Sequence, residues 1–149
     1  MSRQEIYAWS SLATSSVLLI FYLTAVYGWP VPIESSEEYL SGILWKVLGI
    51  AVVVELILDT MHSLQVGGVS KDERDVRIES KGYRNAYYVL AGALVAVMVH
   101  LFISDIVTSA AGQDRYLSVP FATVHVLLVI LLGASIIKSS TQLYYYNKG

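Results

Sequence analysis

The sequence predicts an all-α protein, an integral membrane four-helix bundle, and two observations predict this fold class. Hydrophobic residues make up 55% of the 149-residue chain and charged residues only 15%, which is too apolar for a soluble domain of this size. The apolar residues also gather into four long runs, and a membrane-spanning helix needs about 20 such residues. We therefore expect one transmembrane domain that covers residues 1–149.

The four predicted spans lie near residues 6–27, 43–62, 85–107 and 119–138. The first apolar run is longer than the core of a typical secretory signal peptide. No clear small-residue cleavage site follows it before Trp29 and Pro30. We therefore interpret the first run as a retained helix.

The positions of the Lys and Arg residues predict the orientation of the four spans, because cationic loops are translocated poorly. An even number of spans places both termini and the connection over residues 63–84 on one side of the membrane. That side carries all of the ten Lys and Arg residues except Lys46 and Arg115. The sequence therefore predicts that both termini are cytoplasmic. Aromatic residues near both ends of the spans, such as Trp9 and Trp45, agree with this layout.

Composition also excludes several kinds of function. The chain has no cysteine, so it forms no disulfide, iron–sulfur cluster, thiolate zinc site or thiol nucleophile. The net charge is −2 and the charges are mixed, so no basic tract is present that would neutralise many phosphates. We expect no nucleic-acid partner.

A charged helix is predicted over residues 71–84, between the second and third spans. The run Ser70-Lys71-Asp72-Glu73 is a capping-box pattern that begins a helix, and we expect this helix to continue into the third span. Its charges are sorted by sign onto roughly opposite faces. The basic face comprises Arg74, Arg77, Lys81 and Arg84, and the acidic face comprises Asp72, Asp75 and Glu79. Either the arginines contact anionic lipid headgroups, or the acidic face docks a basic partner or a second copy.

One segment of this helix resembles a known family. The segment reads Asp72-Glu73-Arg74-Asp75, then Ile78, Lys81-Gly82 and Arg84, then Ala86-Tyr87-Tyr88-Val89-Leu90. It is similar to a large, uncharacterised family of small four-span bacterial inner-membrane proteins with a D-E-R-[DE]-x-x-I-x-x-[KR]-[AG] signature between their second and third helices. The resemblance implies a multi-pass protein of the bacterial inner (cytoplasmic) membrane. It implies no particular chemistry.

The second span carries three ionisable residues on one helical stripe, Glu55, Asp59 and His62. Such groups are costly in hydrocarbon and mark functional sites or buried pairs. The structural interpretation is an ion pair between Glu55 and Arg84 or Lys81 at the start of the third span. The functional interpretations are a proton-relay carboxylate at Glu55 or a metal site that uses Asp59 and His62 together with ligands from other helices.

Two further histidines, His100 and His125, are predicted at nearly the same depth in the third and fourth spans. Axial ligation of a haem between helices requires such a level pair. The structural alternative is that each side chain makes a hydrogen bond between helices.

These patterns predict a small, non-enzymatic membrane protein with an interaction, regulatory or accessory role and no catalytic residue. The expected partners are the lipid bilayer and a second copy or a larger membrane complex. Two alternatives remain open. One is a dimeric proton-coupled transporter or channel that uses Glu55, and the other is a haem- or metal-binding electron-transfer protein that uses His100 and His125. No cofactor is favoured, and haem belongs only to the second alternative.

Overall fold

Four helices make up the part of the chain that the computed structural model describes, and no strand occurs there. The described residues are 3–27, 37–66, 72–111 and 122–148, and within them the side chains at positions 3, 27, 37, 59, 62–66, 108–111 and 122 are outside the description. The helices are α1 (Arg3–Tyr27), α2 (Glu37–Val66), α3 (Glu73–Ala111) and α4 (Ala122–Lys148). All four are long and apolar enough to cross a membrane, which confirms the predicted fold class.

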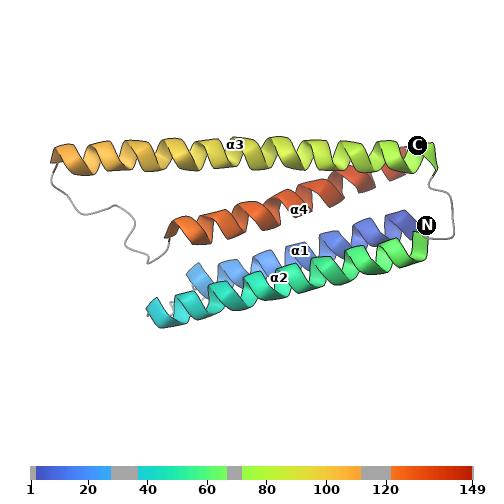
Figure 1. Cartoon of the computed structure of the whole chain (residues 1–149), viewed down its shortest axis with the longest axis horizontal. Helices are drawn as coiled ribbons and strands as arrows, with labels where there is room; N and C mark the ends of the chain where they lie inside the picture. The colour runs from blue at the N-terminus through green and yellow to red at the C-terminus, as the bar shows by residue number, and fades with distance from the viewer. Residues whose placement is uncertain (1–2, 28–36, 67–71, 112–121, 149) are drawn as a thin grey trace.

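The helices alternate in direction, so that one end of the bundle holds the start of α1, the end of α2, the start of α3 and the end of α4 (Figure 1). We call this the terminus end, because the start of α1 and the end of α4 lie there. Both α2 and α4 extend beyond the predicted spans, and α4 continues past Lys138 to Lys148.

The charged segment and the third span form one helix, as the sequence predicted. The helix begins two residues later than the capping box suggested. The backbone N–H of Val76 donates to the carbonyl oxygen of Asp72 at 3.2 Å, so Asp72 occupies the N-cap position. Ser70 and Lys71 lie outside the described residues.

The bundle is open rather than square, because α4 packs between α3 and α1, and α2 packs on α1. Figure 1 shows this order, with α3 and α2 on the two outer edges. Most of the core therefore lies between α1, α2 and α4. It consists of Tyr22, Leu44, Val47, Leu128 and Leu132, which are all buried.

Small and polar residues form the contact between α1 and α4. The Ser139 hydroxyl donates to the Ser11 hydroxyl at 3.1 Å, and Ser15 and Ser135 share a hydrogen bond of 2.9 Å. Ser11 and Ser139 are fully buried. Serine side chains let two helices approach closely while their hydroxyl groups bond across the interface, and this pairing fixes α1 against the centre of α4.

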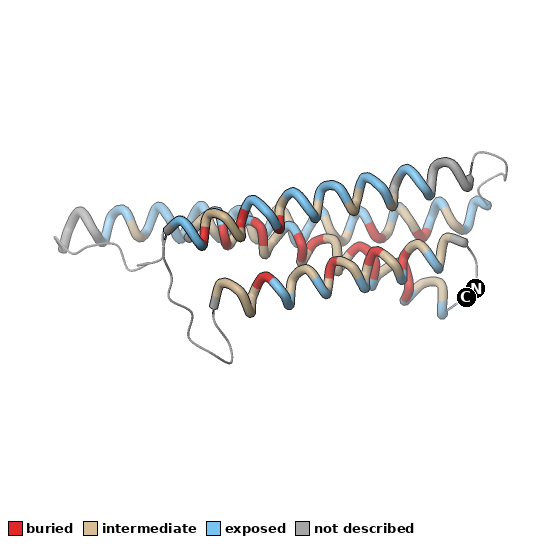
Figure 2. Tube along the Cα trace, turned by 90° about the horizontal axis from the view of Figure 1, so that it is seen from below, coloured by how far each residue is buried: buried red, intermediate tan, exposed pale blue. Residues whose placement is uncertain are grey.

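Helix α3 meets α4 most closely near the terminus end. A Cβ atom at Gly82 would lie 2.7 Å from Cγ of Gln142 and 3.0 Å from the carbonyl oxygen of Lys138, so only glycine fits this approach. The buried Ile78 and a 3.4 Å hydrogen bond from Asn85 to Thr141 extend the same contact. Beyond it, α3 projects past the other helices and its surface is mainly exposed (Figures 1 and 2).

Candidate functional site

An ion pair between Glu55 and Lys138 joins α2 to α4. The Lys138 Nζ donates to Glu55 Oε1 at 3.0 Å. The Lys138 side chain is only 9% exposed, whereas the Glu55 side chain is 44% exposed. The two charges therefore differ in their surroundings, because the cation is nearly buried and is exposed only where it lines a cavity, whereas the carboxylate remains accessible.

The sequence suggested Arg84 or Lys81 as the partner of Glu55, and this prediction was wrong. The partner in the structure is Lys138. Arg84 is exposed, and the Lys81 ammonium lies 4.0 Å from the centre of the Tyr145 ring. The reason is the order of the helices. Because α3 packs on α4, the cations at the start of α3 are held away from α2.

Lys138 also lies beside two tyrosine rings. Its ammonium is 5.1 Å from the centre of the Tyr83 ring and 5.9 Å from that of the Tyr7 ring. A cation within about 6 Å of an aromatic face is attracted by the ring quadrupole. Tyr7, Glu55, Tyr83 and Lys138 come from α1, α2, α3 and α4 in turn, and we call these four residues the Lys138 site.

A cavity of about 580 Å³ adjoins the ion pair. Its volume is within the range of about 300–1,000 Å³ that is typical of small-molecule sites. The polar residues that line it are Thr14, Ser15, Glu55, Tyr83, Ser135 and Lys138. The rest of the lining is apolar and comes from all four helices. The cavity thus combines the ion pair with hydroxyl groups from α1, α3 and α4 inside a mainly apolar bundle.

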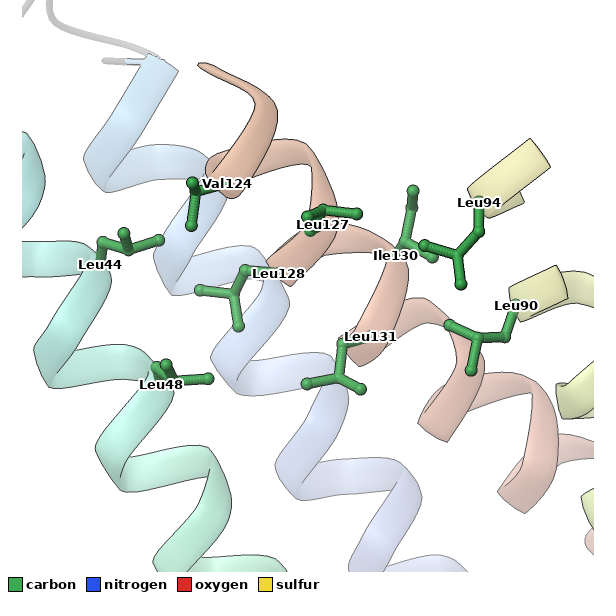
Figure 3. A pocket seen from close by; sticks show the side chains of 9 residues that line it. All are labelled: Leu44, Leu48, Leu90, Leu94, Val124, Leu127, Leu128, Ile130 and Leu131. Carbon is green, nitrogen blue, oxygen red and sulfur yellow. The ribbon is translucent and has the colours of Figure 1, made fainter. Parts of the chain in front are cut away.

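A second cavity, of about 280 Å³, lies farther from the terminus end and is lined only by aliphatic side chains. Figure 3 shows that leucines of α2 and α3 face it from opposite sides and that α4 lies between them. The lining residues are Leu44, Leu48, Leu90, Leu94, Val124, Leu127, Leu128, Ile130 and Leu131.

The predicted stripe on α2 also includes Asp59 and His62, and the structure does not test their roles. The side chains of Asp59 and His62 lie outside the described residues. Among the side chains that the structure does describe, no three His, Asp or Glu residues lie close enough to hold one metal ion.

The structure does not turn His100 and His125 toward each other. His125 is buried and shares a hydrogen bond through Nδ1 with the hydroxyl of Tyr22 on α1. The rings of Tyr22 and His125 stack with their centres 5.9 Å apart. His100 is exposed on α3. The geometry therefore gives His125 the interhelical hydrogen bond of the structural alternative.

Residues 72–84, at the start of α3, carry the two charged faces, and we call this segment the α3 extension. The two faces have different surroundings. Asp75 and Glu79 on the acidic face are half-buried, and the Tyr146 hydroxyl of α4 donates a hydrogen bond to Asp75. Asp72, at the start of the helix, is exposed. On the basic face, Lys81 is half-buried against Tyr145.

The three arginines of the basic face, Arg74, Arg77 and Arg84, are exposed. Arg77 also pairs with Glu73 at 2.8 Å in an exposed ion pair one helical turn apart. Two of the three acidic residues, Asp75 and Glu79, are therefore partly covered by the rest of the chain, whereas the three arginines are exposed.

Sequence reasoning missed Lys138, Tyr7 and Tyr83 as site residues. In the sequence, Lys138 is the last residue of the fourth predicted span. The sequence did contain a signal that the helix continues past Lys138. Ser139 and Gln142 follow it with helical spacing and include a small residue that suits a contact between helices. Gly82 was noted only as part of the family-like motif.

No protein-family model, curated protein or solved structure matches this chain. The resemblance of residues 72–90 to small bacterial inner-membrane proteins therefore stays a prediction.

Proposed function

We propose that the chain is a non-enzymatic accessory or regulatory protein of a bacterial inner membrane, with both termini cytoplasmic and with the α3 extension attached to anionic lipid headgroups. The orientation rests on the distribution of Lys and Arg, of which only Lys46 and Arg115 fall at the opposite end. A second copy or a larger complex would associate along the exposed face of α3 that carries Gly92, Ala96 and His100.

The observation that carries this proposal is the asymmetry of the α3 extension. Asp75 and Glu79 are half-buried and lie near Tyr146 of α4, so α4 already covers part of the acidic face. The exposed arginines are Arg74, Arg77 and Arg84. Each basic residue near an anionic membrane surface contributes about 1 kcal/mol. Contact with lipid headgroups therefore explains the exposed basic face better than docking through the acidic face.

The lipid contact is tested by replacing Arg74, Arg77 and Arg84 together with Gln. In detergent, added phosphatidylglycerol is expected to raise the thermal midpoint of the wild type more than phosphatidylcholine does, and the triple variant is expected to lose this difference. Lys46→Gln is the control, because Lys46 is exposed at the opposite end. An equal response of the wild type and the triple variant would contradict the proposal.

The orientation is tested with single cysteines, for which the cysteine-free chain provides a clean background. Glu38 and Ser80 are exposed at opposite ends of the bundle. In intact cells, a membrane-impermeant maleimide is expected to label Glu38→Cys but not Ser80→Cys until the cells are opened. Labelling of Ser80→Cys from outside would overturn the assigned orientation.

A second candidate function is proton-coupled transport that uses Glu55, and the cavity beside this half-exposed carboxylate is the observation that favours it. Proteoliposomes with an internal pH dye test this candidate. A proton flux that the wild type carries and Glu55→Gln lacks would support it, and equal traces for empty, wild-type and Glu55→Gln vesicles would oppose it.

A further inference from the structure

The two cavities follow one another along α4, between α2 and α3, and α1 also lines the polar one. We call the two cavities together the groove. Along α4 the aliphatic cavity takes residues from Val124 to Leu131, and the polar cavity continues from Leu131 to Lys138. Helix α2 contributes Leu44 and Leu48 to the first cavity and residues 51–56 to the second. Leu131 lines both cavities, so the two cavities adjoin at this residue.

The order on α3 agrees with this arrangement. Leu94 and Leu90 line the aliphatic cavity, and Ala86 and Tyr83 line the polar one. At 1.5 Å per residue, the groove runs roughly 21 Å along α4 from its first to its last lining residue. One leaflet of a bilayer has a hydrocarbon depth of about 15 Å, so the groove is long enough for an acyl chain.

The groove opens sideways, between two helices whose outer surfaces are apolar. Val52 and Leu56 of α2 and Tyr83 of α3 line the polar cavity and are exposed. In a membrane, this opening faces the bilayer rather than bulk water. A molecule that enters from the bilayer and fills both parts must have an apolar tail for the leucine-lined part and a polar head for the Lys138 site.

The charges at the Lys138 site indicate the kind of head. Glu55 and Lys138 neutralise each other, so a head with a single net charge would leave that charge uncompensated in a medium of low polarity. A zwitterion keeps the site neutral. The accessible Glu55 carboxylate accepts hydrogen bonds from a primary ammonium, and Lys138 has further N–H donors for a phosphate, since only one is used by Glu55.

From this combination of shape and charge we propose that the groove binds one phospholipid with a zwitterionic head that carries a primary ammonium, of the phosphatidylethanolamine type. Its ammonium is bound by Glu55 and its phosphate by Lys138, and an acyl chain lies along the leucines of α2, α3 and α4. The site is separate from the exposed arginines of the α3 extension, which contact anionic headgroups from outside the bundle.

Native mass spectrometry of the delipidated protein with added lipids tests this proposal. The wild type is expected to retain one phosphatidylethanolamine about tenfold more than phosphatidylcholine, because a quaternary ammonium cannot donate hydrogen bonds to the carboxylate. The double variant Glu55→Gln/Lys138→Gln is expected to lose this preference. The triple variant of Arg74, Arg77 and Arg84 is expected to keep it, which separates the groove from the function proposed for the α3 extension.

Blocking the groove provides a second test. Leu131→Trp at the junction of the two cavities is expected to abolish retention of the lipid, whereas Leu101→Trp, on the exposed surface of α3, is the control. Leu94→Trp fills the groove from the other wall if Leu131→Trp fails to fold by circular dichroism. Equal retention of the two lipids by the wild type, or an unchanged preference in the double variant, would overturn the proposal.

Discussion

Replacing Glu55 with Gln tests whether the ion pair with Lys138 holds the bundle together. The change keeps the size of the side chain and one hydrogen-bond acceptor, but it leaves the Lys138 ammonium without its counter-ion. That ammonium is nearly buried, since its side chain is only 9% exposed. We therefore expect the variant to be less stable than the wild type.

The magnitude follows from the burial of the two partners. Removing one member of a fully buried pair costs about 3–5 kcal/mol, whereas an exposed pair contributes about 0–1 kcal/mol. The Glu55 side chain is 44% exposed, and the rings of Tyr7 and Tyr83 remain beside the cation. We expect a loss of about 1–3 kcal/mol, with a shift of the thermal midpoint of roughly 2–4 °C for each kcal/mol.

A double-mutant cycle isolates the pair from other effects of each change. The partner variant is Lys138→Met, which keeps the apolar stem, and it should cost less than Glu55→Gln because the carboxylate that it leaves alone is accessible. The double variant should recover most of the loss. A thermal midpoint of Glu55→Gln at or above that of the wild type, in the same detergent, would refute the reasoning and favour a working titratable carboxylate.

Three further changes test the packing that positions this site, each by thermal unfolding in detergent. Gly82→Ala should lower stability by about 1–3 kcal/mol because its Cβ would overlap α4, whereas Gly49→Ala, where no atom lies within 4 Å of the added Cβ, should be neutral or slightly stabilising; equal midpoints would mean that α3 does not approach α4 as described. Tyr22→Phe should cost about 0.5–2 kcal/mol by removing the hydroxyl bonded to His125, and an unchanged midpoint would show that this bond contributes nothing. Ser139→Leu should overfill the buried contact between α1 and α4 and cost at least about 1–3 kcal/mol, so a stable variant would argue against that contact.

The sequence by itself determined the number of helices and the continuity of α3. Four long apolar runs can satisfy their backbone hydrogen bonds in a membrane only as helices, so these elements follow from local composition. The run from Asp72 onward has no proline before the third span, and the opposite faces for the two signs of charge follow from helical periodicity. All of these features depend on neighbours along the chain.

The tertiary structure decided which residues meet. Both the lipid-facing and the core-facing surfaces of these helices are apolar, as the exposed Val52 and the buried Val47 on α2 illustrate, so hydrophobic periodicity does not show which face points inward. The rotation and order of the helices depend instead on close contacts between segments distant in sequence, such as Ser11 with Ser139 and Gly82 with α4. Those contacts place α4 at the centre of the bundle, and for that reason Glu55 meets Lys138 rather than a cation of α3.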